Sequence, residues 1–329
     1  MSGSVPTSRP GPRIVFLGTP EPAVRVLEAV LAAGFPVSLV VTRPDRPRGR
    51  GLDTSASPVK CAALSAGLPV FEPEDVNSDA SVERVRAEAP DLLLIVAYGR
   101  ILKKGLRAVP RLLPLNVHFS LLPEYRGAAP VARAIADGKT ITGVTLQRIV
   151  RKLDAGPVLA AEEVPIGPDE TAAELADRLA AVGAELTVRT LDRLGRGETG
   201  ETPQDESRAT LAPMLSKEEG EVDWSRSAHA LHCHVRAMDP WPGARSVYRS
   251  AARGDAVEVL LLRSRPGPPG DRAGPPPGTV LRADAEGLLV QTGDGGLLVT
   301  ELKPAGKRAL TAREFVNGYR AASGDILSR

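Results

Sequence analysis

The chain has 329 residues, of which 42% are apolar and 25% charged, so it is neither collagen-like nor wholly disordered and is long enough for about two domains. Lys and Arg (42) nearly balance Asp and Glu (40), which excludes a basic footprint for nucleic acid over the whole chain and leaves only a local one. Two distant cysteines, Cys61 and Cys233, make neither a disulfide framework nor a paired metal motif, and this usage is typical of a reducing cytoplasm.

The first half of the chain alternates strand and helix patterns after a Ser/Pro/Gly-rich stretch at 1–12. That stretch lacks the apolar core of a secretory signal, so we expect a flexible tail. Strands are expected at 13–18, 37–42, 69–71, 91–97 and 115–119, and helices at 22–33, 57–66, 79–89 and 129–136. Continuous apolar strands that alternate with helices predict a mostly parallel sheet with helices on both faces. The longest apolar run, 92–97, is too short to cross a membrane.

After about residue 140 the pattern changes. Residues 141–149 and 157–166 alternate loosely and predict an antiparallel edge of the sheet. Residues 171–194 predict one long helix, in which Gly183 marks a candidate break. The polar stretch 195–208, rich in Gly, Glu, Thr and Pro, is typical of a linker.

From about residue 209 the sequence indicates a second, smaller domain. One helix is expected at 225–237, and short strands are expected at 245–248, 257–262, 279–282, 287–291 and 297–302. Regularly spaced short strands predict a small barrel or sandwich. We therefore expect a catalytic domain over 13–194, a linker over 195–208 and a β-barrel domain over 209–329, with a Pro/Gly-rich loop at 265–278.

The clearest candidate chemistry lies where the strand at 115–119 ends. Asn116 and His118 are two positions apart, so their side chains point the same way, at the strand end where open α/β sheets bind ligands. A carboxamide beside an imidazole suits an oxygen that gains negative charge. Asp154, in a later turn, would orient the ring and favour its protonated form. The alternative is that His118 is a hydrogen-bonded core histidine and Asp154 a turn residue.

Two other motifs are weaker. Gly18 opens a turn without the further glycines of a dinucleotide fingerprint, which favours a tight strand–helix connection. His229, His232 and Cys233 could share one helical face and suggest a metal site. No second ligand cluster accompanies them in the sequence, so packing of an amphipathic helix is the favoured interpretation.

With these residues in place, the chain resembles the formyltetrahydrofolate-dependent formyltransferases. The resemblance rests on Asn116-x-His118, the following Ser-Leu-Leu-Pro at 120–123, and Asp154. Relatives that act on glycinamide ribonucleotide or on nucleotide sugars share these motifs. Further matching segments, which resemble the branch that acts on charged tRNA, are 16–20, 44–51, 57–60, 125–130, 215–219, 223–225, 240–242 and 304–307.

The resemblance implies a Rossmann-like catalytic domain and an OB-like C-terminal barrel. It implies transfer of the formyl group of 10-formyltetrahydrofolate to the α-amino group of initiator methionyl-tRNA, in the cytoplasm, without a metal, a membrane or an obligate protein partner. In that reaction Asn116 and His118 would stabilise the oxyanion of a tetrahedral intermediate, and Asp154 would polarise His118 and help to remove the amine proton.

The resemblance also implies two sets of binding residues. Expected around the folate are Ser120, Leu121, Leu122 and Pro123 with Tyr98, Gly99 and Ile101. A basic loop at 43–60, whose five positive charges against Asp45 and Asp53 leave a charge of +3, is expected to contact the tRNA. Its basic residues are Arg43, Arg46, Arg48, Arg50 and Lys60. A solvated surface loop is the alternative for this basic segment.

The sequence departs from the family pattern at three places. Phe119 stands where the family has a small residue, Ala155 replaces a Thr, and the loop at 265–278 is expanded. None of them removes a candidate catalytic residue. The competing functions are a sugar-nucleotide formyltransferase and a non-enzymatic RNA-binding protein derived from a formyltransferase.

Overall fold

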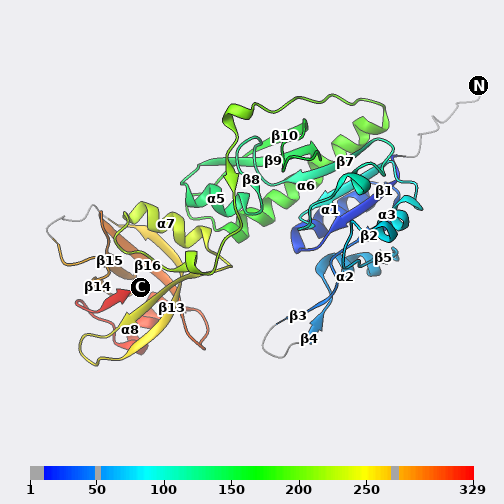
Figure 1. The fold of residues 1–329 in the computed structure, drawn as a ribbon. Coiled ribbons are helices and arrows are strands. Elements are labelled where there is room, and N and C mark those ends of the chain that lie inside the picture. Colours follow the sequence, from blue (N-terminus) through cyan, green and yellow to red (C-terminus); the bar gives the residue numbers. More distant parts are fainter. Residues whose placement is uncertain (1–10, 49–52, 268–273) are drawn as a thin grey trace, which may run out of the picture. The chain divides into compact units, whose positions relative to one another are not determined.

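The structure, a computed structural model, describes residues 11–48, 53–267 and 274–329 (Figure 1). All of the predicted tail except residues 11 and 12 lies outside these ranges, as does the middle of the loop at 265–278. The chain forms two compact units, each made of three segments. The first comprises the described parts of 1–128, 142–164 and 176–212, and the second comprises 129–141, 165–175 and the described parts of 213–329.

The first unit is built on a seven-stranded sheet with the order β10-β9-β7-β6-β1-β2-β5. Its parallel strands are β1 (Ile14–Gly18), β2 (Val37–Val41), β5 (Val70–Phe71), β6 (Leu92–Val96) and β7 (Leu113–His118). At the other end of the sheet, β9 (Ile141–Arg148) pairs antiparallel with β7 and is followed by β10 (Val158–Pro165). The mostly parallel Rossmann-like sheet with an antiparallel edge is thus confirmed.

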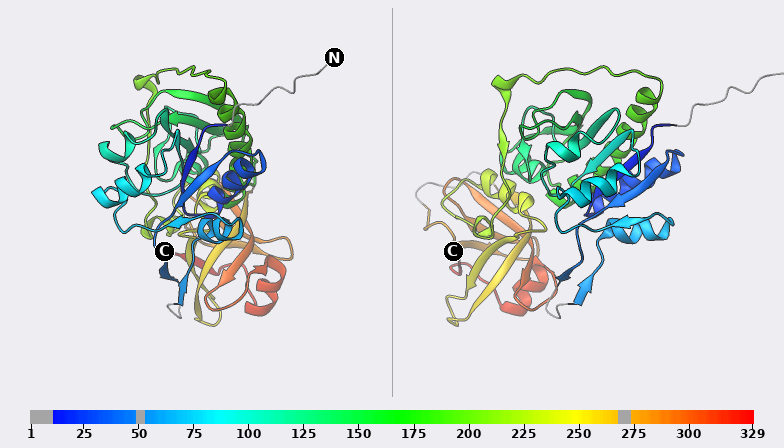
Figure 2. Two further views of the ribbon diagram at one scale, coloured as in Figure 1. Left: turned by 90° about the vertical axis from the view of Figure 1, so that its right-hand side faces the viewer. Right: turned by 45° about the vertical axis from the view of Figure 1, so that its right-hand side comes forward.

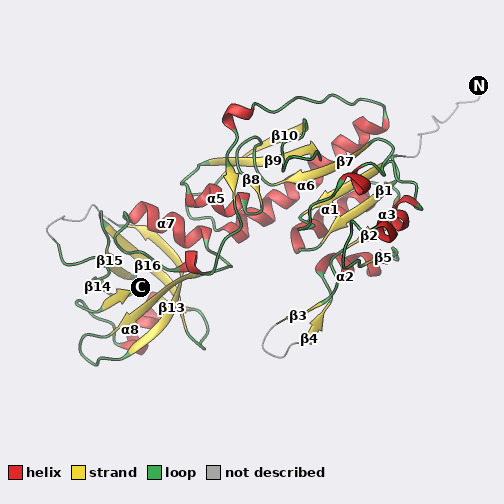
Figure 3. Ribbon diagram, in the orientation of Figure 1, coloured by secondary structure: helices red, strands yellow, loops and turns green. Residues whose placement is uncertain are grey.

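Helices flank this sheet (Figure 3). They are α1 (Glu21–Ala32), α2 (Pro58–Ser65), α3 (Asp79–Arg86), α4 (Lys104–Arg107) and most of α6 (Ala172–Gly195). On one face, Val82 and Val85 of α3 pack into an apolar cluster with Ile95 of β6. Helix α2 begins as the sequence predicts, because the Ser57 side chain accepts a hydrogen bond from the Lys60 N–H.

The other face of the sheet packs against α6, and here one expectation is wrong. Gly183 does not break α6, which runs unbroken from Ala172 to Gly195. A Cβ at Gly183 would lie 3.2 Å from Val117 and 3.4 Å from Val144, so the glycine lets the helix approach the sheet closely. Because side chains alternate along a strand, Val117 faces α6, while Asn116 and His118 face the opposite side.

Short strands that the sequence did not reveal fix two loops of the first unit. In the basic segment, β3 (Arg46–Arg48) pairs antiparallel with β4 (Asp53–Ser55), and this hairpin extends beyond α2 (Figures 1 and 2). In the predicted linker, a 3₁₀ turn at Glu206–Arg208 leads into β11 (Leu211–Ala212), which pairs with β8 (Arg126–Gly127). The stretch after α6 therefore belongs to the first unit, and the predicted domain bounds stay a prediction.

The second unit is a mainly antiparallel sheet with the order β14-β15-β16-β13-β12-β18, and β17 pairs with β16. Its strands are β12 (Ala244–Arg249), β13 (Ala256–Pro266), β14 (Val280–Ala283), β15 (Leu288–Gln291), β16 (Gly296–Pro304), β17 (Leu310–Thr311) and β18 (Ile326–Ser328). Its helices include α5 (Pro130–Ala136), α7 (Ala228–Ala237) and α8 (Ala312–Tyr319). The expected small barrel-like domain is confirmed. Within the described ranges, no helix meets the length and apolarity needed to cross a bilayer.

Candidate active site

Strand β7 carries two of the predicted catalytic side chains to its carboxyl end. Asn116 lies opposite Gln147 of β9 and Ile95 of β6, and His118 lies opposite Thr145. His118 is buried, whereas Asn116 is half-buried. Among the residues that the structure describes, the Asn116 amide has no hydrogen-bond partner, so its donors can turn toward a bound substrate.

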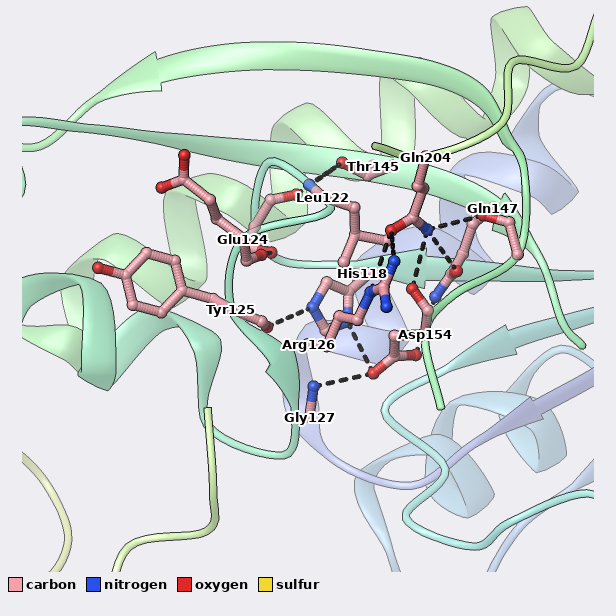
Figure 4. A network of polar contacts seen from close by, with 12 residues as sticks. His118, Leu122, Glu124, Tyr125, Arg126, Gly127, Thr145, Gln147, Asp154 and Gln204 are labelled. Carbon is pink, nitrogen blue, oxygen red and sulfur yellow. Dashed lines mark hydrogen bonds and ion pairs between the residues drawn. The ribbon is translucent and has the colours of Figure 1, made fainter. Parts of the chain in front are cut away.

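Both nitrogens of His118 have partners (Figure 4). Its Nε2 lies 2.9 Å from the carbonyl oxygen of Tyr125, and because a carbonyl only accepts, Nε2 carries a proton and donates it. Its Nδ1 lies 3.8 Å from Oδ2 of Asp154. The predicted proximity of His118 and Asp154 is therefore present, and the ring is held from both sides.

Asp154 presents its carboxylate from a turn in which its own φ is +46°, a backbone conformation that Asp tolerates better than most residues. Its Oδ1 accepts from Nε2 of Gln147 at 2.8 Å, and its Oδ2 accepts from the N–H of Gly127 at 2.9 Å. These donors hold a negative charge beside His118. Gln147, a buried residue of β9, is one that the sequence did not single out.

The predicted linker supplies further polar groups that sequence reasoning missed. Gln204 contacts Arg126 and the Asp154 turn, and Glu206 forms an ion pair with Arg126 at 2.9 Å. The guanidinium of Arg126 and the ammonium of Lys152 lower the pKa of Glu206 to about 2. Nothing in the local sequence distinguishes these residues from those of a solvated linker, because their partners lie far away in the chain.

The predicted folate residues of the loop after β7 are anchored on β9. The Ser120 hydroxyl is buried and donates to the carbonyl of Glu124. The Leu122 N–H donates to Oγ1 of Thr145 at 3.1 Å. Ser120 thus stabilises the loop from inside, whereas Leu121 and Leu122 are half-buried and Pro123 is buried.

Phe119, which departs from the family pattern, points away from the candidate catalytic residues. A Cβ built on Gly183 of α6 would lie 3.5 Å from the Phe119 ring. The ring therefore packs on the α6 side of the sheet, opposite His118. The larger side chain at this position does not enter the space around the imidazole.

Two of the three other predicted folate residues line a cavity of about 310 Å³ at the carboxyl ends of β2, β5 and β6. Its lining includes Tyr98 and Ile101 together with Arg43, which the sequence had assigned to tRNA. Burial raises the pKa of Tyr98 to about 12, whereas Ile101 is 75% exposed. Gly99, with a φ of +75°, turns the chain between them. The loop at 120–123 does not line this cavity.

The five predicted tRNA residues lie in different settings. Lys60 of α2 is held by Asp45 at 2.6 Å and Glu72 at 2.7 Å, and these carboxylates raise its pKa. Lys60 therefore anchors the base of the basic segment. Arg46 and Arg48 lie on β3, Arg43 lines the cavity described above, and Arg50 lies outside the described residues.

The histidines of α7 face different partners. His229 Nε2 lies 3.8 Å from Sγ of Cys233, whereas His232 contacts Ser264 and the carbonyl of Pro168. Within 11–48, 53–267 and 274–329, no group of three or more His, Cys, Asp or Glu side chains is arranged to hold a metal ion. The contacts of His229 and His232 with neighbouring side chains and a main-chain carbonyl are those expected of a packed helix face.

Comparisons with known proteins extend over both units. Residues 12–191 match the family model described as formyl transferase, and residues 214–320 match that of its C-terminal domain. The methionyl-tRNA formyltransferase of Solibacter usitatus is 44% identical over 315 residues, covering 96% of this chain and 98% of the relative. That of Roseiflexus castenholzii is 45% identical over 316 residues, with the same coverages.

Solved structures share the fold at lower identity. HypX from Aquifex aeolicus, solved with tetrahydrofolic acid, matches with a TM-score of 0.62 and 22% identity, covering 94% of this chain and 48% of that one. The N-formyltransferase from Helicobacter canadensis, solved with folinic acid and dTDP-3-aminofucose, matches with a TM-score of 0.62 and 18% identity, covering 87% and 98%. At these identities the likeness concerns the fold alone.

Proposed function

This chain belongs to the formyl transferase family, and from that premise we propose that it transfers the formyl group of 10-formyltetrahydrofolate to the α-amino group of initiator methionyl-tRNA. The observation that carries the proposal is the identity of 44–45%, over nearly the whole chain, to relatives named methionyl-tRNA formyltransferase. The product is N-formylmethionyl-tRNA, used to initiate translation. We place the reaction in the cytoplasm, which suits the two free cysteines.

The proposed chemistry is direct attack by the amine. The lone pair of the methionyl nitrogen forms a bond to the formyl carbon, and the formyl oxygen takes up the negative charge. When this tetrahedral intermediate collapses, the bond from carbon to the folate nitrogen breaks, and the proton lost by the amine is balanced by the proton that the leaving nitrogen gains. No covalent intermediate with the protein is needed.

The side chains at the end of β7 fit this charge development. The Asn116 amide donates to the forming oxyanion, and the formyl oxygen replaces the Tyr125 carbonyl as acceptor for the Nε2–H of His118. Asp154, 3.8 Å from Nδ1, stabilises the ring when it is positively charged. An α-amino group has an ordinary pKa near ~7.7–8.0, so a modest base is enough to deprotonate it.

The surroundings fit a flat, polar-edged pterin and an anionic RNA. Ile101, Leu121 and Leu122 offer apolar surface beside main-chain groups at the same edge of the sheet. The basic segment, anchored through Lys60, would contact phosphates of the acceptor end. We assign Ser120, Pro123 and Tyr98, which are buried, to shaping the folate pocket from beneath.

A comparison of acceptors tests the proposal. The protein is incubated with 10-formyltetrahydrofolate and either methionyl-tRNA or a nucleotide sugar that carries an amino group, and N-formyl product is measured. We expect rapid formylation of methionyl-tRNA and none of the sugar. Preference for the sugar, or no transfer to either acceptor, would contradict it.

A further inference from the structure

One side-chain amide outside the candidate catalytic residues holds the turn that presents Asp154. Gln204 lies between α6 and β11, and its Nε2 donates to the carbonyl oxygens of Asp154 at 2.8 Å and Gly156 at 2.7 Å (Figure 4). With a φ of +46°, Asp154 is in a conformation that residues with a side chain disfavour. The two hydrogen bonds from Gln204 hold the chain at Asp154 and directly after it, at Gly156.

Arg126 fixes which way the Gln204 amide points. Its Nη2 donates to Oε1 of Gln204 at 2.7 Å and its Nε does so at 3.1 Å. Because a guanidinium only donates, the amide oxygen must face Arg126 and the amide nitrogen must face the turn. Arg126 itself is 2% exposed and is held by both carboxylate oxygens of Glu206, so its orientation is also fixed.

The hydrogen bonds continue in the same donor-to-acceptor direction as far as the Asp154 carboxylate. Nε2 of Gln204 lies 3.4 Å from Oε1 of Gln147, and Nε2 of Gln147 donates to Oδ1 of Asp154 at 2.8 Å. The chain of donors therefore runs from Arg126 through two amides to Asp154. Outside it, Lys152 of the same turn contacts Glu206 at 2.5 Å, which ties the turn a second time to the stretch after α6.

We propose that Gln204, oriented by Arg126, is a positioning residue for the formyl transfer: it holds the Asp154 turn so that the carboxylate stays beside Nδ1 of His118. The inference rests on the proposed function for the reaction that it serves. Gln204 touches no reacting atom. Its effect passes through the placement of Asp154, so it acts on turnover and on the pH dependence of turnover, and substrate affinity is little affected.

The substitution Gln204→Glu tests this directly. A glutamate still accepts from Arg126 but cannot donate to the two carbonyl oxygens, so the turn loses its anchor while the shape of the side chain is kept. We expect kcat to fall about 10- to 100-fold, with KM for both substrates changed less than about threefold. The pH profile of kcat should also be displaced, because the carboxylate moves relative to His118.

Glu201→Gln is the matched control. Glu201 lies on the same stretch and forms an ion pair with Arg148, whose Nε is 2.9 Å from Oε1, but its side chain does not contact the Asp154 turn. We expect this variant to keep kcat and the pH profile of the wild type. Arg126→Lys, which keeps the charge but not the planar fork, should reproduce the displaced pH profile of Gln204→Glu.

Gln204→Ala replaces Gln204→Glu if the glutamate variant does not fold. A folded Gln204 variant with kcat and pH profile within twofold of the wild type overturns the inference, as does an equal loss in Glu201→Gln. Wild-type protein that does not formylate methionyl-tRNA contradicts the proposed function instead. The inference is then judged by NMR: the ring protons of His118 must shift in the Gln204 variant and not in Glu201→Gln, and unchanged shifts overturn it.

Discussion

At the scale of single residues, the site is organised by hydrogen-bond donors that meet a carboxylate. Asp154 receives the amide of Gln147 on one oxygen and the N–H of Gly127 on the other. Both donors are fixed by strands, since Gln147 lies in β9 and Gly127 in β8. Other groups therefore set the position of the carboxylate that lies beside the His118 imidazole. The Nε2–H of His118 can exchange the Tyr125 carbonyl for a substrate oxygen as its acceptor.

The first prediction concerns His118. In His118→Ala the donor to the oxyanion is lost, so kcat should fall by about 10² to 10³. Affinity for 10-formyltetrahydrofolate should change only a few-fold, because the 120–123 part of the loop after β7 is held by Thr145 and by the Ser120 hydroxyl, whereas the imidazole contacts the loop only at the carbonyl of Tyr125. Steady-state kinetics on methionyl-tRNA, with folate binding measured separately, check both parts.

His229→Ala is the control for loss of a histidine, because His229 is exposed on α7. It should leave kcat unchanged. Turnover of His118→Ala close to that of the wild type would remove His118 from the proposed mechanism.

The sequence predicted the proximity of His118 and Asp154 and missed the residues that enforce it. Two-residue spacing on a strand placed Asn116 and His118 on one face, the need for a carboxylate beside the imidazole pointed to Asp154, and the family resemblance matched it. Gln204 contacts the Asp154 turn across 50 positions and Arg126 across 78. A side-chain amide or guanidinium has no periodicity that indicates such distant partners, so these contacts become visible only in the folded chain.

At the scale of elements, the basic segment is a hairpin with an anchored base. Lys60 lies between Asp45 and Glu72, so α2 and the carboxyl ends of β2 and β5 hold the residues next to the hairpin. The backbone of Arg46 and Arg48 is paired with β4. Two of the predicted tRNA residues thus belong to a defined element of the first unit.

The second prediction tests that element with the double variant Arg46→Ala, Arg50→Ala. If the hairpin contacts phosphates, KM for methionyl-tRNA should rise, and its salt dependence should become shallower by about one unit of slope for each lost contact. Affinity for 10-formyltetrahydrofolate should be unchanged. Kinetics at several salt concentrations measure all three quantities.

The matched control removes two exposed arginines elsewhere in the first unit, Arg86 and Arg111, whose side chains are 52% and 73% exposed. This variant should keep the wild-type salt slope. If both double variants behave alike, the basic segment is a solvated surface feature and tRNA is recognised by other residues.

Element prediction succeeded for long patterns and failed for short ones. The strands of the first sheet and its longer helices were found, but the four-residue α4 was not, and β8 and β11 have two residues each, too few for any pattern. Helix α8 was missed although Thr311 and Glu314 form a capping box, a spacing that a search for helix starts can recognise. Phe315 of α8 is fully buried and lies 5.1 Å from Tyr248, ring centre to ring centre, so packing stabilises this short helix.

At the scale of the whole molecule, the two units can be followed separately during unfolding. Both tryptophans of the chain, Trp224 and Trp241, belong to the second unit, so tryptophan fluorescence reports on that unit alone. The same unit contains His234 of α7, which is 8% exposed. Burial, with Arg226 as a secondary cause, lowers the pKa of His234 to about 4.

The third prediction follows from that shift. Between pH 6.5 and 4 the unfolded chain binds a proton at His234 that the folded chain does not, so the free energy of unfolding falls as the pH falls through this window. The loss from this group is at most about 3 kcal/mol and stops near pH 4. In His234→Gln this part of the pH dependence should disappear, as measured by denaturant titration followed by tryptophan fluorescence.

His229→Gln serves as the control, because His229 is exposed and should leave the pH dependence as it is. Equal slopes of stability against pH in the wild type and in His234→Gln would show that His234 does not titrate with the unfolding of this unit. The comparison concerns only the slope of the free energy of unfolding against pH between pH 6.5 and 4. It is therefore valid even if a substitution changes the stability by a constant amount.

The division of both units among separated stretches of chain has a consequence for biosynthesis. A ribosome releases residues in order, and the first unit needs every segment up to Ala212, with 129–141 and 165–175 of the second unit made on the way. Until β11 emerges, β8 has no partner strand. Gln204 emerges only shortly before β11, so the Asp154 turn also lacks its contact with Gln204 up to that point. The reaction centre therefore stays unfinished until about two thirds of the chain has been made, although the last strand of the sheet ends at Pro165. In the interval between the two a chaperone has most to protect.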